Sequence, residues 1–213
     1  MAVIVGLDEC GTGAFVGPAH AGCVACDIVD FNRKVGRYLT DSKAMDEERR
    51  FRAAPVIKKY ALSWHVAEAP LKEIAKDHKM AWRRAMFRAV RAVVHELGDD
   101  AEFSLIIDGD QDDFLDAKLR QHLDVDPIWQ KKADTRFPAV MAAAILAKTT
   151  RDALMIELDS QFPEFGWAKN KGYGVPGHIE ACEEHGITEH HRPIPRLRKF
   201  KPYDPKTTWY RQG

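Results

Sequence analysis

The stretch VIVGLDE, residues 3–9, gives the first indication of the fold, because an apolar run ends there in two adjacent carboxylates. Its lack of polar alternation is typical of a strand buried on both faces of a sheet. FSLIID, residues 103–108, has the same form and ends in Asp108. If the two strands are neighbours, Asp8, Glu9 and Asp108 meet at one sheet edge. Carboxylates that close repel one another unless a divalent cation neutralises them, whereas carboxylates at separate strand ends are simply solvated.

The remaining hydrophobic pattern predicts a mixed five-stranded sheet flanked by helices, an α/β fold. A second strand is expected from Gly17-Pro18 to about Cys26, a third over residues 61–67 and a fifth over residues 127–132. The longest helix is expected over residues 70–97. Further helices are expected from about Asp46, where Pro55 should kink or end the helix, and over residues 114–122, 139–158 and 179–185. The small side chains of residues 139–158 favour close packing on the sheet.

Length and composition limit the domain organisation and the compartment. With 213 residues, 45% of them hydrophobic, the chain suits one domain with a small appendage. We expect a main domain over residues 1–169 and a helical, basic C-terminal appendage over residues 170–213. No apolar run approaches the roughly 20 residues of a membrane span, and the early Asp8 and Glu9 do not fit a secretory signal. We therefore expect a cytoplasmic monomer without membrane association.

The four cysteines do not indicate a disulfide scaffold or a zinc site in a chain of this size. Cys23 and Cys26 form a single CxxC within the apolar run of the second strand, where residues three apart point to opposite faces. A structural zinc site would need a second pair of ligands. Buried apolar thiols in a reducing compartment are the favoured interpretation.

Charge is balanced over the whole chain, with 32 basic and 32 acidic residues, but it is unevenly distributed. Residues 72–91 contain seven Lys or Arg against two acidic residues, and residues 191–211 contain seven against Asp204 alone. Acidic clusters lie apart from them, at residues 8–9 and 108–113. Such a separation suits a protein that binds phosphates in one place and a metal in another, although a solvated helix face and a basic tail would look the same.

The glycine-rich bend Gly11-Thr12-Gly13 follows the first strand, as a dinucleotide-binding loop would. The next glycine, Gly17, comes one position too late for that motif, and two carboxylates would repel a pyrophosphate. Glycines here more plausibly let the backbone approach another group closely, for example a ribose.

Six motifs in order, from residue 3 to about residue 192, resemble the type 2 ribonuclease H family (ribonuclease HII). They are GLDECGTG with Gly17-Pro18, the TDSK of residues 40–43, Asp108-Gly109, the signature from Lys132 to Asp152 that contains Asp134 and Lys148, the NKGYG of residues 170–174 with His178, and His191-Arg192. Each motif is weak alone, but six in the family's order are specific. The resemblance implies a ribonuclease H-like fold.

The resemblance also implies an endonuclease that hydrolyses the RNA strand of RNA–DNA hybrids, or ribonucleotides embedded in DNA, leaving 5′-phosphate and 3′-hydroxyl ends. It implies a two-metal site for Mg²⁺ or Mn²⁺. The catalytic and metal ligands that it implies are Asp8, Glu9, Asp108 and Asp134. The substrate-binding residues that it implies are Gly11, Thr12 and Gly13, the cations Lys43 and Lys148, and Tyr173, whose ring would stack on a sugar.

Two departures from the family pattern leave alternatives open. Thr12 stands where the family usually has arginine, which resembles the type 3 branch that prefers longer hybrids, yet that branch is not expected to keep Asp134 and Tyr173. The segment between Asp108 and Asp134 also contains several other carboxylates, and Asp112 could replace Asp134 as the fourth ligand.

Two other functions fit the same scaffold: a non-catalytic nucleic-acid-binding protein and a structure-specific DNA nuclease. The complete set of four acidic residues disfavours the first, and the loop that carries Tyr173 disfavours the second.

Overall fold

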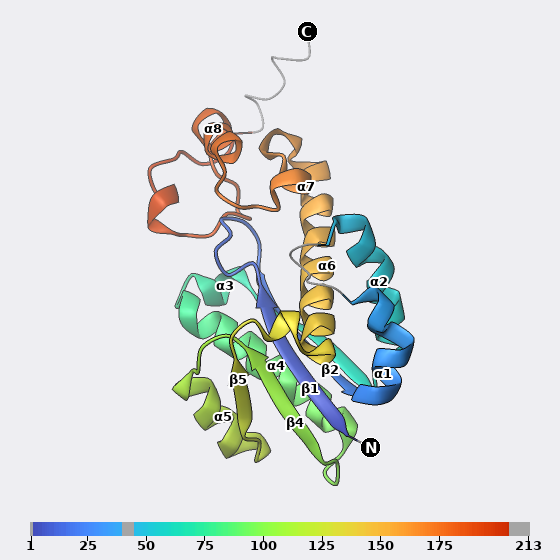
Figure 1. Ribbon diagram of the computed structural model, residues 1–213. Helices are drawn as coiled ribbons and strands as arrows, with labels where there is room; N and C mark the ends of the chain where they lie inside the picture. The colour runs from blue at the N-terminus through green and yellow to red at the C-terminus, as the bar shows by residue number, and fades with distance from the viewer. Residues whose placement is uncertain (1, 40–44, 205–213) are drawn as a thin grey trace.

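The computed structural model describes residues 2–39 and 45–204, which form a five-stranded mixed sheet (Figure 1). The strands are β1 (Val3–Cys10), β2 (Ala19–Asp27), β3 (Ser63–Ala69), β4 (Phe103–Asp108) and β5 (Pro127–Gln130), in the order β3-β2-β1-β4-β5. The pairs β1–β2 and β2–β3 are antiparallel, whereas β1–β4 and β4–β5 are parallel. The predicted α/β class and the mixed five-stranded sheet are confirmed.

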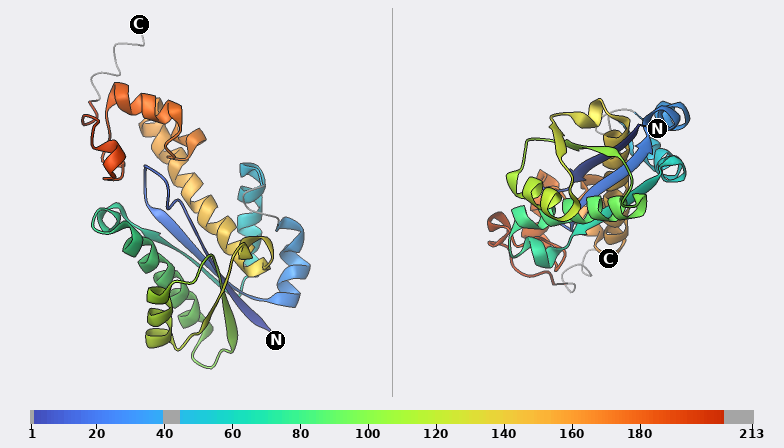
Figure 2. Two further views of the ribbon diagram at one scale, coloured as in Figure 1. Left: turned by 60° about the vertical axis from the view of Figure 1, so that its left-hand side comes forward. Right: turned by 90° about the horizontal axis from the view of Figure 1, so that it is seen from below.

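Helices cover both faces of this sheet (Figure 2). One face packs against α4 (His78–Leu97) and α5 (Asp113–Leu123). The other packs against α1 (Ile28–Val35), α2 (Glu47–Tyr60) and α6 (Pro138–Gln161). Because alternate residues of a strand point to opposite faces, β1 and β2 contribute side chains to both apolar layers. The molecule is therefore a three-layer sandwich with β1 at the centre of the sheet.

Helix α6 crosses β1 and β2 at very short distance because the strands carry glycine at the crossing points. A Cβ on Gly6 would lie 2.3 Å from the backbone of Ala139, and a Cβ on Gly22 would lie 2.2 Å from the carbonyl oxygen of Ala143. Any larger residue at either position would push the helix off the sheet. The small-residue pattern of residues 139–158 predicted this close packing correctly.

The predicted helix over residues 70–97 is wrong as a single element. The chain forms α3 (Leu71–Ile74), breaks, and restarts as α4, because the side chain of Asp77 accepts a hydrogen bond from the Met80 amide at 3.0 Å and caps the second helix. The longest helix is α6, with 24 residues.

The prediction that the helix ends at Pro55 needs correction, and one further helix was not predicted. Helix α2 does not end at Pro55 but continues through it to Tyr60. Pro55 lies on the exposed face of that helix, where the carbonyl that loses its partner can bond to water. Helix α1, capped by the Asp27 side chain, was not predicted.

The segments after α6 form a third apolar cluster at the far end of that helix (Figure 1). They contain α7 (Trp167–Asn170) and α8 (Pro176–His185). The cluster also contains Phe15 and Val16 from the β1–β2 connection and Met155 from α6. Elsewhere and within these segments, short 3-10 turns occupy Gly36–Tyr38, Ala133–Thr135, Pro163–Phe165 and Pro195–Leu197. The apolar cluster contains residues from both sides of the predicted boundary between residues 169 and 170. The boundary itself stays a prediction.

All four cysteines are free, and Cys23 and Cys26 are fully buried on opposite faces of the sheet, as predicted. Within residues 2–39 and 45–204, none of the helices has the length and apolarity to cross a membrane.

Candidate active site

Three carboxylates meet at the carboxyl ends of the central strands. In the parallel pair of β1 and β4, Leu7 lies opposite Ile107, so the next residues, Asp8 and Asp108, lie side by side on neighbouring strands. Asp134 reaches the same place from the 3-10 turn after β5. Carboxylate oxygens of Asp8, Asp108 and Asp134 all lie within 4.8 Å of one another. The proximity of Asp8 and Asp108 that the two apolar runs predicted is thus found in the structure, with Asp134 as the third carboxylate in place of Glu9.

The electrostatics of this trio fit a divalent cation. Burial raises the pKa of Asp8 well above its usual value, and the neighbouring charges of Glu9 and Asp108 raise it further. The Glu9 amide offsets this in part by donating to Asp8 Oδ1 at 2.8 Å. The Ala133 amide donates to Asp108 Oδ1 at 2.6 Å. Oxygen ligands crowded in this way are those that Mg²⁺ and Mn²⁺ bind.

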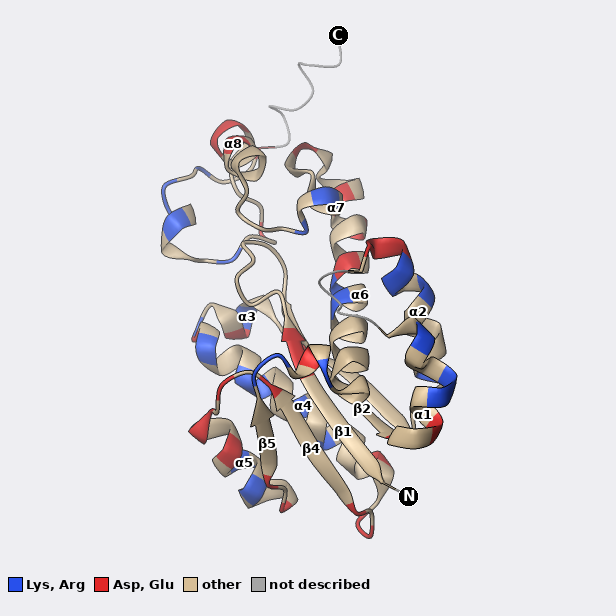
Figure 3. Ribbon diagram, viewed as in Figure 1, with Lys and Arg blue, Asp and Glu red and all other residues tan. Residues whose placement is uncertain are grey.

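Asp8 and Asp108 line a cavity of about 490 Å³ whose wall combines acidic and basic side chains. Asp134 is buried behind them and is not part of that wall. Glu9 lines this cavity beside Asp8, although it is not one of the three carboxylates within 4.8 Å. Lys148 and Tyr173, both expected at the site, also line it. Figure 3 shows acidic residues at the upper end of β1 and basic residues on α2, α4 and the connection after β5.

Asp112, the alternative fourth ligand, lies elsewhere. Its side chain caps α5 by accepting from the Leu115 amide at 2.9 Å, and it forms an ion pair with Arg83 at 2.5 Å. Arg88 of the same basic stretch pairs with Glu73 at 3.1 Å. Some of the cations predicted to bind phosphate therefore also hold helices together. Lys43 and the rest of the TDSK motif lie outside the described residues.

The glycine loop is fixed through the Thr12 carbonyl, which accepts hydrogen bonds from Arg192 Nη1 and His78 Nε2, each at 2.8 Å. Gly11 has a φ of +77°, and a Cβ there would lie 2.2 Å from Arg151 Nε. Glycine is required at this position both by conformation and by space. Gly13, by contrast, is exposed and has no heavy atom within 4 Å of its Cβ position.

Tyr173 stands at the mouth of the cavity with 42% of its surface exposed. The Arg151 guanidinium lies 5.7 Å from the ring centroid, within cation–π range. Its loop is joined to the glycine loop by the Phe15 amide, which donates to the Gly172 carbonyl at 2.8 Å. The two loops expected to contact substrate thus form one unit.

Two buried arginines that the sequence analysis left without a role hold this unit together. Arg151 Nη2 donates to the carbonyls of Val16 and Lys171, at 3.2 and 2.8 Å, and Arg192 Nε donates to the Gly17 carbonyl at 2.8 Å. Burial and the charge of Arg151 lower the pKa of Arg192 to about 10. Both arginines belong to the quoted motifs, which could have marked them, whereas His78 had no sequence signal.

The comparisons with known proteins all point to one family. The sequence model of the ribonuclease HII family matches residues 5–201. Among curated relatives, ribonuclease HII of Azoarcus sp. is 39% identical over 191 residues, covering 89% of this chain and 85% of the relative. The ribonuclease HII of Nitrosomonas europaea is 35% identical over 190 residues, covering 89% and 81%.

The chain belongs to the ribonuclease HII family.

Solved structures show the same fold. The ribonuclease H2 of Pyrococcus horikoshii superposes with a TM-score of 0.71 at 25% identity, covering 85% of this chain and 86% of that one. The ribonuclease HII in the PCNA complex of Archaeoglobus fulgidus gives a TM-score of 0.73 at 23% identity, covering 93% and 98%. As a ribonuclease HII, the chain is a ribonuclease H enzyme that acts on RNA–DNA hybrids and depends on a divalent metal.

Proposed function

We propose that this ribonuclease HII hydrolyses the RNA strand of a hybrid duplex by two-metal-ion catalysis and leaves 5′-phosphate and 3′-hydroxyl ends. The observation that carries the proposal is the approach of Asp8, Asp108 and Asp134 to within 4.8 Å, beside the cavity that Asp8 and Asp108 line. Together with Glu9 these residues would hold the ions. When bound, such ions activate a water molecule and neutralise charge on the reacting phosphate.

The protein's own groups bind and orient the duplex around that centre. Lys148 and the glycine loop line the same cavity as the carboxylates, so a phosphate and its ribose could lie between them. Gly13 is exposed and no heavy atom lies near its Cβ position, so a ribose can approach the backbone of the loop there. Tyr173 offers its exposed ring to the neighbouring sugar. Recognition of ribose by backbone and by Tyr173 restricts cutting to RNA.

The ion would be Mg²⁺ or Mn²⁺. An all-carboxylate set suits both, since both are hard cations that prefer oxygen ligands. A related fold, the ribonuclease HIII named Bst-RNase HIII, has been solved in complex with Mn²⁺.

Cleavage of three matched duplexes tests the proposal: all-DNA, continuous RNA–DNA hybrid, and DNA with one embedded ribonucleotide, each with Mg²⁺, Mn²⁺ or EDTA. We expect cutting of the ribose-containing duplexes alone, only with metal. Asp8→Asn, Asp108→Asn and Asp134→Asn should each reduce kcat by roughly a hundredfold or more, because the ions contribute several kcal/mol.

Asp112→Asn is the matched control, because asparagine still caps α5. It should change kcat by less than about threefold, since Asp112 lies away from the three carboxylates. The melting temperature should fall, because the ion pair with Arg83 loses its charge. Damage by Asp112→Asn that equals or exceeds damage by Asp134→Asn would refute the assignment of the fourth ligand.

A further inference from the structure

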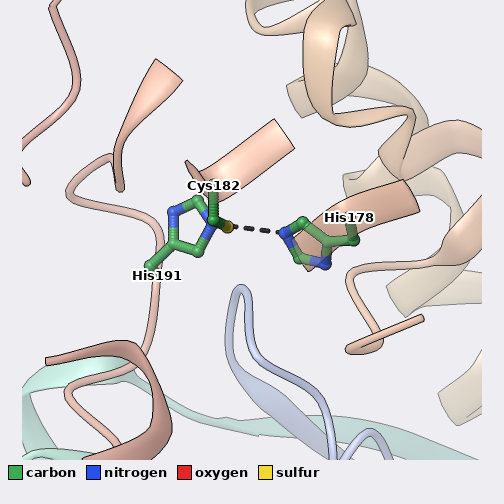
Figure 4. Close-up of side chains that lie close together, drawn as sticks. All are labelled: His178, Cys182 and His191. Atoms are coloured by element: carbon green, nitrogen blue, oxygen red, sulfur yellow. Dashed lines mark hydrogen bonds between the residues drawn. The ribbon is translucent and has the colours of Figure 1, made fainter. Parts of the chain in front are cut away.

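Three side chains converge inside the C-terminal segments, away from the carboxylates. His178 and Cys182 lie one turn apart on α8, and His191 approaches them from the chain that follows (Figure 4). All three are buried. The Nε2 atoms of the two histidines are 3.2 Å apart, and Cys182 Sγ is 3.4 Å from His191 Nε2. Two nitrogens and a sulfur at such spacing invite comparison with a zinc site.

The surrounding hydrogen bonds determine which ring nitrogens carry protons. Trp167 Nε1 can only donate, and it lies 3.1 Å from His178 Nε2, so this nitrogen is the acceptor and Nδ1 carries the proton. The Thr188 amide donates to His191 Nδ1 at 3.0 Å, so Nε2 of His191 carries its proton. The N–H groups of Trp167 Nε1 and His191 Nε2 therefore both point at His178 Nε2, whose lone pair a metal would need. This arrangement is a hydrogen-bonded chain and not a metal site.

The chain of hydrogen bonds ends at the tyrosine of the substrate-binding loop. His178 Nδ1 lies 2.9 Å from the Tyr173 carbonyl oxygen and donates to it. The Val175 amide donates to the same oxygen at 2.9 Å, so both of its lone pairs are used. The imidazole cannot rotate away, because Trp167 and His191 hold its other nitrogen.

The loop needs such a contact from outside. Lys171 and Gly172 have left-handed backbone conformations, with φ of +52° and +72°. For Lys171 this conformation is unfavourable and persists only when surrounding contacts impose it. The Tyr173 ring is half-exposed and is contacted by the Arg151 guanidinium. Its backbone sets the position from which the ring reaches this contact and the cavity.

We propose that His178 is a positioning residue for Tyr173: as the Nδ1–H tautomer held by Trp167 and His191, it fixes the tyrosine carbonyl and so directs the ring toward the ribose. The inference rests on the proposed role of Tyr173 in reading ribose. Burial supports it, because it lowers the pKa of both histidines, that of His191 to about 3, and keeps both rings neutral at physiological pH.

Two isosteric variants separate this role from simple packing. In His178→Asn the amide nitrogen replaces Nδ1 and can still donate to Tyr173, whereas in His178→Gln it replaces Nε2 and cannot. We expect kcat/KM on the single-ribonucleotide duplex to fall roughly tenfold in His178→Gln and less than threefold in His178→Asn, the loss that one hydrogen bond predicts. Melting temperatures, measured in parallel, should fall similarly in both.

A double-mutant cycle with Tyr173→Ala gives the decisive comparison. In that background His178→Gln should cost no further activity, because the ring that it positions is gone. An equal cost in both backgrounds would overturn the inference and leave His178 a packing residue. If wild-type enzyme failed to cut any ribose-containing duplex, the proposed function itself would fail, which is a separate outcome.

The wild-type protein provides a test that needs no variant. Nitrogen-15 NMR of the histidine side chains should show the proton on Nδ1 of His178 and on Nε2 of His191, and Cys182→Ala should leave both tautomers and kcat/KM unchanged within threefold. The reverse tautomers, or one zinc per purified chain that is lost in Cys182→Ala, would overturn the hydrogen-bonded chain.

Discussion

Thr12→Arg should shift the substrate preference of this enzyme toward a single ribonucleotide in DNA. The Thr12 carbonyl is held by Arg192 and His78, and its backbone is not in the left-handed region, so an arginine can be introduced without strain. The residue is only half-buried and lines the cavity, from which a longer side chain can reach a phosphate. The native threonine is too short to make that contact.

The magnitude follows from two opposing terms. A charge-assisted hydrogen bond to phosphate stabilises by roughly 1.5–3 kcal/mol. Ordering the long side chain costs about 0.5–1.5 kcal/mol. The net gain of about 1–2 kcal/mol corresponds to roughly 5- to 30-fold in kcat/KM. The gain should appear mainly on the single-ribonucleotide duplex, because a continuous hybrid has other contacts that hold it in place.

The assay is kcat/KM on the single-ribonucleotide duplex and on the continuous hybrid, for wild type, Thr12→Arg and the uncharged control Thr12→Met. We expect the ratio of the two values to rise in Thr12→Arg alone, and to rise less at high salt, where phosphate contacts weaken. A wild type that already prefers the single ribonucleotide, with no change of the ratio in Thr12→Arg, would refute the proposed phosphate contact. An equal rise of the ratio in Thr12→Met would refute it as well.

Three further outcomes are expected. In EDTA, Asp8→Asn should raise the free energy of unfolding at pH 7, because the raised pKa of the buried Asp8 carboxyl makes its ionisation unfavourable. The gain should be smaller at pH 4, where the carboxyl is protonated to a greater extent, and urea titrations that show a lower free energy of unfolding in the variant would contradict this. Burial lowers the pKa of His20 to about 4 and that of His191 to about 3, so between pH 6.5 and 4 only the unfolded chain binds these protons. Stability should fall there as the pH falls, by up to about 1.4 kcal/mol per pH unit for each histidine, and a flat profile would exclude neutral rings. Truncation after Asp204, which keeps the apolar cluster but removes two basic residues, should lower the slope of log affinity against log salt by roughly one to two units, whereas an unchanged slope would show that the tail does not contact phosphate.

The sequence by itself determined the chemistry of the site and the class of the fold. Apolar runs that end in Asp8 and Asp108 are local features, and their strand conformation follows from side-chain pattern alone. The order of the motifs identified the family and, through it, pointed to Asp134. The hydrophobic periodicity of the sequence could not show that Asp134 lies near the other carboxylates. The small side chains of residues 139–158 likewise predicted a helix that packs closely on the sheet.

Only the tertiary structure decided which of these pieces meet. Asp8 and Asp108 are neighbours because β1 pairs with β4 in parallel, a choice made by packing between segments about a hundred residues apart. The Thr12 carbonyl is bound by Arg192 from the other end of the chain, and Tyr173 is held by a histidine whose tautomer depends on Trp167 and His191. Local pattern specifies what an element is and which face it buries. The strand order and the hydrogen bonds of buried polar groups depend on which partners the whole fold brings within reach, and that is settled only when the chain packs.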